Sequence, residues 1–452
     1  MKKILLLLGV SASVTVSAQT LSPDWTTIQN TSFTLATSGV RYLDAVDANV
    51  VWASNYDGSA PSRNYNSFTR TINGGTSFNT GNVFADTNIY VMSSIEGINA
   101  TTAFVTAYYK ASSDMGVVYK TTNGGTTWAN CITSGMFSTS GSSFANFTCF
   151  TSSLTGVACG DPVGGVFEIY RTTDGGSTWT AVTATNIPNP ASDYGLNDCY
   201  AKLGNNIWFG TSGGRVFRSS DAGLTWTVGT TTASNGITKL AFRDAMNGLA
   251  YGYTSTAASS FSVYKTTDGG ATWTVISPVP ANIGKKGLSA IPGTNKYASC
   301  GSATTNTVLA YSTDDGATWT DWGSVGIQYL DIDFVDANTG WAGAFQSSGN
   351  GGMYKYVSST TDIKGVSDLS NQINAFPNPS KGIVNVAISL QNKENLSISV
   401  SNTLGQVIIF NNYSSISNET LSLDLSNQHN GIYFVSVSNG VEKTVKRVVL
   451  NK

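Results

Sequence analysis

The sequence predicts an all-β protein, in which a seven-bladed β-propeller is followed by a small C-terminal β-sandwich. Three observations support this prediction. A hairpin motif recurs at a nearly fixed spacing, strand-like segments precede each copy, and residues 374–452 follow a different strand pattern. A fixed period with β-rich content and one tight turn per unit is typical of propellers and solenoids.

The repeated motif is clearest in YKTTDGGATW, residues 264–273. Its aromatic–basic–Thr–Thr run suits a strand. Asx-Gly-Gly suits a tight turn, because the Asx side chain bonds the backbone ahead of it and Gly tolerates positive φ. Each copy therefore predicts a hairpin closed by its own turn. The copies end at aromatic residues 78, 128, 179, 226, 273 and 319, at intervals of 50, 51, 47, 47 and 46 residues.

This motif resembles the Asp-box, also called the BNR repeat, with the pattern S/T-x-D-x-G-x-T-W. The resemblance implies a fold element that lies away from the ligand-binding face. We therefore expect a structural role for the Asx residues and closing tryptophans of the boxes. They are Asn73, Asn123, Asp174, Asp221, Asp268, Asp314, Trp128, Trp179, Trp226, Trp273 and Trp319.

Seven blades follow from the first strands of the repeats, which we expect near residues 40, 90, 145, 196, 237, 287 and 328. The last repeat, residues 327–357, has three strands without a fourth. Conversely, Trp25–Ile28 resembles the strand after each box but has no box before it. We expect this N-terminal strand to complete the last blade and close the propeller, residues 19–357, which removes exposed sheet edges.

The segments near residues 147, 240 and 332 share an F-x-D-x-x-x-G-x-A-x-G rhythm. Together with the box, this rhythm resembles the photosystem II stability/assembly-factor-like subgroup of BNR propellers, within the sialidase-like superfamily. The resemblance covers roughly residues 25–357 and implies the fold. An exported chain with a different C-terminus need not share the role of the photosynthetic members.

Residues 1–18 are expected to form a signal peptide. Lys2 and Lys3 precede a short apolar run, and cleavage is expected between Ala18 and Gln19. The run is too short to span a membrane, and no later apolar segment is long enough, so we expect no transmembrane segment. Removal of the two lysines changes the formal charge from −2 to −4. This acidic balance argues against a nucleic-acid partner.

Residues 358–373 are polar and are expected to form a linker. From Asn374 onward, alternating strands predict a small antiparallel sandwich. This segment resembles the type A C-terminal sorting domain of the type IX (Por) secretion system. The shared features are Pro377-Asn378-Pro379, the TLGQ turn at 403–406, Gly431-Ile432-Tyr433 and the final VVLNK. The resemblance implies a partnership with the type IX machinery and release or attachment at the outer surface of a Gram-negative bacterium of the Bacteroidetes type.

The sequence argues against several kinds of chemistry in the propeller. The only histidine is His429, in the sorting domain, which excludes a His-based triad or a His-ligated metal in the propeller. Asp331, Asp333 and Asp336 are candidate calcium ligands by residue type, but they lack the EF-hand spacing of Gly and Glu. We therefore expect no metal and no cofactor.

The five cysteines fit buried core positions better than a disulfide framework, although disulfides remain an alternative.

Ligand-binding candidates come from loops that the topology places on one face. The box turns and the turns between first and second strands share one face. The loops between second and third strands, and between blades, share the other, where aromatic and polar residues suit sugar or peptide ligands. An alternative is that these are solvated loop residues. Asp161 is the most specific, although a lone carboxylate favours a loop cap over an acid catalyst. The candidates are Tyr56, Asp57, Arg63, Tyr65, Tyr109, Lys110, Asp161 and Tyr253.

We expect a secreted or cell-surface, monomeric module that binds a glycan or protein and has no catalytic residue. One alternative is a sialidase-like or xyloglucanase-like glycoside hydrolase. A sialidase needs an arginine cluster, a Tyr nucleophile with a Glu partner, and an acid/base Asp. Two carboxylates about 5–10 Å apart on the loop face would favour this alternative. A second alternative is an assembly factor for a membrane or envelope complex. It would favour a basic stripe, yet residues 20–365 hold 17 basic and 22 acidic residues.

Overall fold

The computed structural model describes most of the chain, which divides into two compact units, Met1–Ser358 and Ser359–Lys452. The expected cleavage site at Ala18 and Gln19, and the candidates Arg63 and Tyr65, lie outside the described residues. The described residues are 22, 24–28, 31–33, 38–58, 66–86, 88–112, 114–303, 306–323, 326–345, 352–358, 369, 372–403, 406–439 and 443–452.

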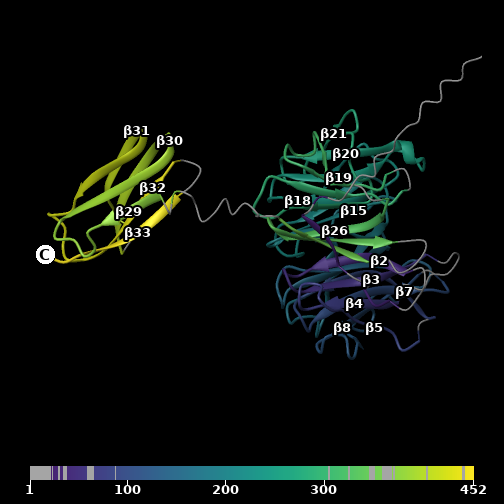
Figure 1. The fold of residues 1–452 in the computed structure, drawn as a ribbon. Coiled ribbons are helices and arrows are strands. Elements are labelled where there is room, and N and C mark those ends of the chain that lie inside the picture. Colours follow the sequence, from purple (N-terminus) through teal and green to yellow (C-terminus); the bar gives the residue numbers. More distant parts are fainter. Residues whose placement is uncertain are drawn as a thin grey trace, which may run out of the picture. The chain divides into compact units, whose positions relative to one another are not determined.

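The first unit consists of seven four-stranded antiparallel sheets, one for each blade (Figure 1). Blade 1 contains β2 (Ser38–Ala45), β3 (Val51–Asp57), β4 (Ser67–Thr71) and β5 (Asn79–Asn82). Blade 2 contains β6 (Tyr90–Gly97), β7 (Ala103–Tyr109), β8 (Val117–Thr121) and β9 (Ala129–Asn130). Blade 3 contains β10 (Ala145–Phe150), β11 (Gly156–Val163), β12 (Val166–Thr172) and β13 (Thr180–Ala181).

Blades 4 to 6 follow the same plan. Blade 4 contains β14 (Gly195–Leu203), β15 (Asn206–Thr211), β16 (Arg215–Ser219) and β17 (Thr227–Thr230). Blade 5 contains β18 (Ile237–Phe242), β19 (Gly248–Tyr253), β20 (Phe261–Thr266) and β21 (Thr274–Ile276). Blade 6 contains β22 (Gly287–Ala290), β23 (Tyr297–Cys300), β24 (Leu309–Ser312) and β25 (Thr320–Asp321). Short 3-10 turns lie at Ala184–Asn186 and Ala258–Ser260. The predicted seven-bladed propeller is confirmed, because each first strand begins close to its expected position.

Blade 7 contains β26 (Gln328–Asp336), β27 (Thr339–Phe345) and β28 (Met353–Val357), and β1 (Trp25–Ile28) is its fourth strand. Trp25 lies opposite Tyr356 in the antiparallel β1–β28 pair. The Trp25 ring is 5% exposed and packs 5.6 Å from the ring of Trp322 and 5.4 Å from that of Tyr356. The predicted closure by the N-terminal strand is therefore confirmed. In Figure 1, β26 of blade 7 lies beside β2 of blade 1.

Basic side chains in the third strands join neighbouring blades. Each reaches a turn of the next blade, and a charged donor on a carbonyl contributes more than a neutral hydrogen bond. Blade 7 joins blade 1 in the same way, so six of the seven junctions have this contact; the third strand of blade 6, β24, carries no basic side chain. The donors and acceptors are Arg70 to Ala100 O (2.5 Å), Lys120 to Gly175 O (2.6 Å), Arg171 to Ala222 O (2.9 Å), Arg218 to Asp268 O (3.4 Å), Lys265 to Asp315 Oδ2 (3.0 Å) and Lys355 to Ala48 O (2.8 Å).

The turn between the third and fourth strands of blades 1 to 6, here called the box turn, is held by its own side chains. In blade 5, Asp268 Oδ1 accepts hydrogen bonds from the Thr266 hydroxyl (2.8 Å) and the Thr272 N–H (2.9 Å). The Thr266 hydroxyl in turn accepts from the Gly270 N–H (2.8 Å), where φ is +93°. Trp273 Nε1 donates to Gly270 O (3.1 Å). The turn thus leaves few polar groups for a ligand.

Asparagine replaces aspartate in the box turns of blades 1 and 2. Asn73 Oδ1 accepts from the Ser77 N–H (3.0 Å), and its Nδ2 donates to the Ser77 hydroxyl (2.8 Å). Asn123 makes the same two bonds to Thr127. The geometry of the turn therefore depends on the oxygen acceptor, and a negative charge is not required.

The second unit is a five-stranded sheet around one apolar core. Its central strand, β30 (Ile383–Asn402), pairs with β29 (Ile373–Phe376), β31 (Val407–Asp424) and β32 (Gly431–Ser438), and β33 (Lys443–Leu450) pairs with β32. Register shifts between Ser389 and Leu396 divide the β30–β31 pair into two halves, which contribute to the same core. The expected β-sandwich is thus built from one continuous sheet.

All five cysteines are free thiols, and four of them are buried. Among the described residues, no helix has the length and apolar character needed to cross a membrane.

Replacement of the ring-closing tryptophan is expected to destabilise the propeller. Trp25→Ala removes a buried aromatic side chain, and the expected loss is about 3–5 kcal/mol of unfolding free energy. Thr26→Ala, at an exposed position of the same strand, is the control. All ten tryptophans lie in the propeller, so a urea titration followed by tryptophan fluorescence reports on this unit. Equal stability of the two variants would contradict the closure model.

The box turns give a prediction with a pH dependence. Asp268→Ala is expected to cost about 1–2 kcal/mol, because backbone N–H groups lose their acceptor. Asp268→Asn, which copies Asn73 and Asn123, is expected to cost less. The Thr272 hydroxyl bond holds the Asp268 pKa at about 2. Its stabilisation is therefore present above the unfolded pKa and is lost as pH falls through about 2. Acid titration is expected to destabilise the Asn variant less than the parent.

Candidate functional site

The first strands of the seven blades surround a central channel, and a cavity opens at each end of it. The loop-face cavity, about 500 Å³, is lined by residues at the beginnings of first strands, such as Asn146 and Gly195. The turn-face cavity, about 520 Å³, is lined by residues at their ends, such as Val46 and Ile98. Lys239 lines both cavities.

The loop-face cavity combines aromatic, amide and charged side chains. Among its described lining residues, Asp161 is the only carboxylate. The paired carboxylates required by a glycosidase are therefore not found among these residues. Side chains of this mixture suit a ligand that stacks on a ring and forms hydrogen bonds. The principal polar and aromatic lining residues are Asn146, Asp161, Tyr194, Tyr253, Lys285 and Lys286.

Asp161 lies near the end of β11, where the pairing with β12 shifts register between Cys159 and Pro162. Its Oδ1 accepts hydrogen bonds from Asn146 Nδ2 (2.8 Å) and from the Gly195 N–H (2.8 Å). Burial raises the pKa of Asp161 to about 6, although both hydrogen bonds oppose this shift. The residue thus links the beginnings of β10 and β14 through one carboxylate oxygen.

The predicted ligand-binding residues do not all meet in one place. Asp161 and Tyr253 line the loop-face cavity. Tyr56 instead packs edge-on against Phe345, with ring centroids 4.9 Å apart, and Asp57 is buried. Tyr109 accepts a hydrogen bond from the Tyr90 hydroxyl (3.3 Å). Lys110 follows Tyr109 in a turn and is half-buried. These four residues lie at or after the ends of second strands, farther from the axis than the first strands.

Sequence reasoning missed the lining residues that precede or open first strands. Tyr194 lies just before β14, Lys285 and Lys286 lie just before β22, and Asn146 lies at the start of β10. The sequence signal was available, because loops between blades had been placed on the same face as Asp161.

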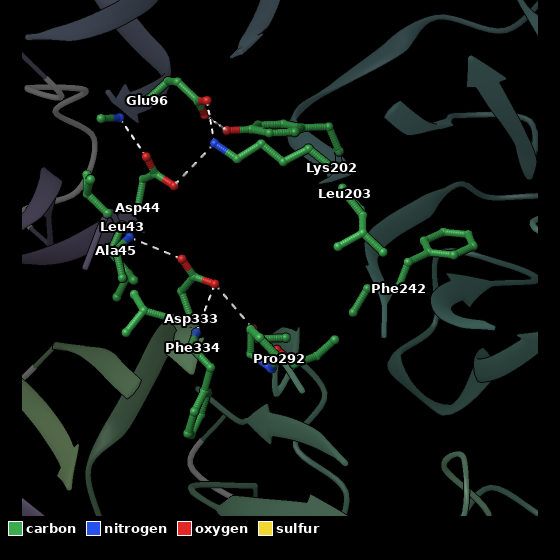
Figure 2. A pocket seen from close by; sticks show the side chains of 18 of the residues that line it. Leu43, Asp44, Ala45, Glu96, Lys202, Leu203, Phe242, Pro292, Asp333 and Phe334 are labelled. Carbon is green, nitrogen blue, oxygen red and sulfur yellow. Dashed lines mark hydrogen bonds and ion pairs between the residues drawn. The ribbon is translucent and has the colours of Figure 1, made fainter. Parts of the chain in front are cut away.

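The turn-face cavity contains a buried ion pair (Figure 2). Glu96 is fully buried, and its Oε1 lies 2.5 Å from Lys202 Nζ. The Tyr200 hydroxyl donates to Glu96 Oε2. Asp44 lies 3.9 Å from the same lysine and accepts a hydrogen bond from the Gly97 N–H. Burial raises the Glu96 pKa, which the positive charge of Lys202 partly offsets.

Two of the aspartates considered for calcium hold blade 7 against blade 1. Asp331 Oδ2 accepts from the Leu43 N–H (3.2 Å), and Asp333 Oδ2 accepts from the Ala45 N–H (3.1 Å). Burial raises the Asp333 pKa to about 7. Asp331 also pairs with Lys239 at 3.1 Å. Among the described residues, no group of three His, Cys, Asp or Glu side chains is placed to hold a metal ion.

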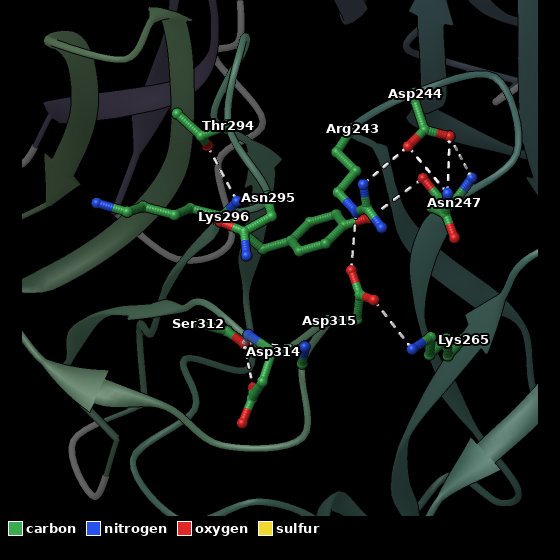
Figure 3. A network of polar contacts seen from close by, with 12 residues as sticks. Arg243, Asp244, Asn247, Lys265, Thr294, Asn295, Lys296, Ser312, Asp314 and Asp315 are labelled. Atoms are coloured by element: carbon green, nitrogen blue, oxygen red, sulfur yellow. Dashed lines mark hydrogen bonds and ion pairs between the residues drawn. The ribbon is translucent and has the colours of Figure 1, made fainter. Parts of the chain in front are cut away.

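A second charged network joins blades 5 and 6 on the turn face (Figure 3). Asp315 accepts from Arg243 Nε (2.8 Å) and from Lys265 Nζ (3.0 Å), while Arg243 also pairs with Asp244 (2.8 Å). Asp315 occupies the position of the first box-turn glycine and has φ of +56°. Its carboxylate thus bridges two blades from a backbone conformation that favours glycine.

The fold and its cavities define this chain as a β-propeller with a candidate ligand site on the loop face. Residues 374–451 match the family model of the secretion system C-terminal sorting domain. The predicted sorting domain is therefore confirmed, and it implies export by the type IX secretion system to the cell surface or extracellular space.

No curated protein matches the chain. Among solved structures, YCF48 bound to a D1 peptide is similar, with a TM-score of 0.51 and 17% identity over 74% of this chain and 95% of that chain. YCF48 from Cyanidioschyzon merolae has a TM-score of 0.51 and 15% identity, over 74% of this chain and 98% of that chain. A Trypanosoma rangeli sialidase has a TM-score of only 0.43 and 8% identity, over 95% of this chain and 89% of that chain. The likeness to YCF48 shows the propeller fold alone, and the lower sialidase score supports no inference about activity.

Removal of the lysine in the buried pair is expected to destabilise the propeller in a pH-dependent way. Lys202→Met leaves Glu96 buried without a cation, at an expected cost of about 3 kcal/mol. Because the folded-state pKa of Glu96 then rises further above its unfolded value, stability is expected to fall as pH increases from 5 to 8. Urea unfolding of Lys202→Met and of Lys202→Met/Glu96→Gln at both pH values checks this. A pH-independent loss, or no recovery in the double variant, would contradict it.

Proposed function

We propose that the propeller is a non-catalytic binding or scaffold module that binds a glycan or a protein in the loop-face cavity. One observation carries this proposal: aromatic, amide and cationic side chains from several blades converge there. The sorting domain delivers the module to the outer surface of a Gram-negative bacterium.

The box turns support the placement of function on the opposite face. Asp174, Asp221, Asp268 and Asp314 all accept hydrogen bonds from their own turns. Side chains engaged in this way hold the hairpin closed and have little capacity to contact a ligand. We therefore assign the box residues a structural role, and the loop face the recognition role.

A glycoside hydrolase is the second candidate, and one observation favours it. Tyr200 is hydrogen-bonded to Glu96 in the turn-face cavity, a pairing of the kind that a tyrosine nucleophile requires. However, burial and the Glu96 charge raise the Tyr200 pKa well above its usual value, which keeps the phenol protonated. Arg243, which also lines this cavity, is tied to Asp315 and Asp244. These features favour a structural ion-pair network.

An assembly factor for an envelope complex is the third candidate. The solved YCF48 structure holds a D1 peptide, and a protein ligand for this chain would be consistent with such a role. The likeness supports this candidate through the fold only. The peptide part of the experiment below addresses it.

The mature chain is expected to bind on a glycan and peptide array without releasing product. Asp161→Ala and Tyr253→Ala are expected to weaken binding about tenfold, because they remove an acceptor and an aromatic contact. Asp336→Asn, an exposed turn residue on the other face, is the control. Fluorogenic sialosides and xyloglucan oligosaccharides test turnover. If the parent releases product and Glu96→Gln abolishes that release, the proposal of a binding module is wrong and the chain is a hydrolase.

A further inference from the structure

We propose that the loop-face cavity binds an acidic saccharide, with Lys286 on its carboxylate and with Asn146 and Asp161 on its hydroxyl groups. This inference rests on the proposed binding function and names its ligand class. Three features of the cavity support it: an unpaired cation, an unpaired buried acceptor, and exposed aromatic rings.

The cationic side of the cavity is formed by three lysines. Lys239 is neutralised by Asp198 (3.0 Å) and Asp331 (3.1 Å). Lys285 Nζ lies 5.4 Å from the centroid of the Phe261 ring. Lys286, by contrast, forms no ion pair or side-chain hydrogen bond among the described residues.

Lys286 lines the cavity, and its side chain is exposed there. Desolvation by neighbouring protein groups first, and then the positive charge of Lys239, lower its pKa. Arg41 adds to this repulsion, while Asp331 opposes it. A cation that stands beside like charges is stabilised by an incoming anion. The cavity therefore offers an anion a site at Lys286 that the protein itself leaves unfilled.

The acceptor side of the cavity is formed by Asn146 and Asp161. Asn146 is 1% exposed, and its Nδ2 donates to Asp161 Oδ1 (2.8 Å). Its Oδ1 is buried and has no hydrogen-bond partner among the described residues. Buried polar atoms are nearly always paired, so an unpaired one beside a cavity indicates a donor supplied by a ligand. A hydroxyl group satisfies this requirement.

The aromatic side distinguishes a saccharide from a peptide. Tyr194 is 55% exposed at the cavity, and Tyr253 lines it as well. An exposed ring face suits the apolar face of a sugar ring. Asn146 and Asp161 are joined by a hydrogen bond, so their oxygens lie close enough to engage neighbouring hydroxyls of one ring. A peptide ending in a carboxylate also offers an anion and N–H donors, and it is therefore an outcome of the test.

Calorimetry with the mature chain tests the inference. The probes are an oligogalacturonate, its methyl ester, an acidic peptide with a free C-terminus, and the amidated peptide. The acidic oligosaccharide is expected to bind at least tenfold more tightly than its ester. Lys286→Met is expected to remove this preference, whereas Asn146→Leu is expected to weaken the acid and the ester alike. Lys296→Met, whose lysine lies near Tyr311 outside this cavity, is the control.

Each outcome has a defined meaning, provided that the thermal unfolding of each variant matches that of the parent. Equal binding of acid and ester, or an unchanged preference in Lys286→Met, overturns the inference. Binding of the peptide alone also overturns it but leaves the proposed binding function intact. If none of the four probes binds, the inference fails, and if the array is also empty, the proposed function fails with it.

Discussion

The propeller depends on the junction between its last blade and its first. Three kinds of contact make this junction. At the outer edge, β1 supplies the fourth strand of blade 7. Nearer the axis, Asp331 and Asp333 accept hydrogen bonds from the backbone of β2. Lys355 adds a bond to Ala48. A closed ring has no exposed strand edge at either end, so this junction removes a site at which another chain could pair.

The two faces of the propeller differ in how their polar side chains are paired. On the turn face, the side chains of the Asp268 turn and of the Arg243–Asp315 pair are bonded within their own blade or to the next one. On the loop face, Asn146 Oδ1 and Lys286 have no partner among the described residues. Since folding leaves few buried polar groups unpaired, the buried Asn146 Oδ1 beside the cavity indicates recognition. The contrast between the faces supports the proposed function.

Charge in the central channel follows from the geometry of the ring. The seven first strands surround the axis, so side chains from different blades line one channel. Glu96 of blade 2 meets Lys202 of blade 4, and Lys239 of blade 5 meets Asp331 of blade 7. These pairs cross the channel and link blades that are not neighbours. These ion pairs favour one arrangement of the blades over arrangements in which the blades are shifted. Burial of the charges costs desolvation free energy in return.

Much of the fold could be predicted because its signals are local. Turn chemistry at residues 264–273, the spacing of its copies, and the strand-like Trp25–Ile28 were sufficient for the blade number and the closure. The sorting domain was predicted from motifs within residues 374–451. Asp161 and Tyr253 were predicted to be on the loop face, and both line the cavity there. Asn146, Tyr194 and Lys286 were not predicted, because they precede or open first strands, where no local motif marks them.

The sequence by itself determined the repeating unit, because each hairpin is held by residues within ten positions of one another. Only the tertiary structure decided which residues meet at the axis. Glu96 and Lys202 are separated by 106 positions, and Asp331 and Leu43 by 288. Their contacts exist because the ring brings distant blades together around one channel. A pattern confined to one blade carries no information about that meeting.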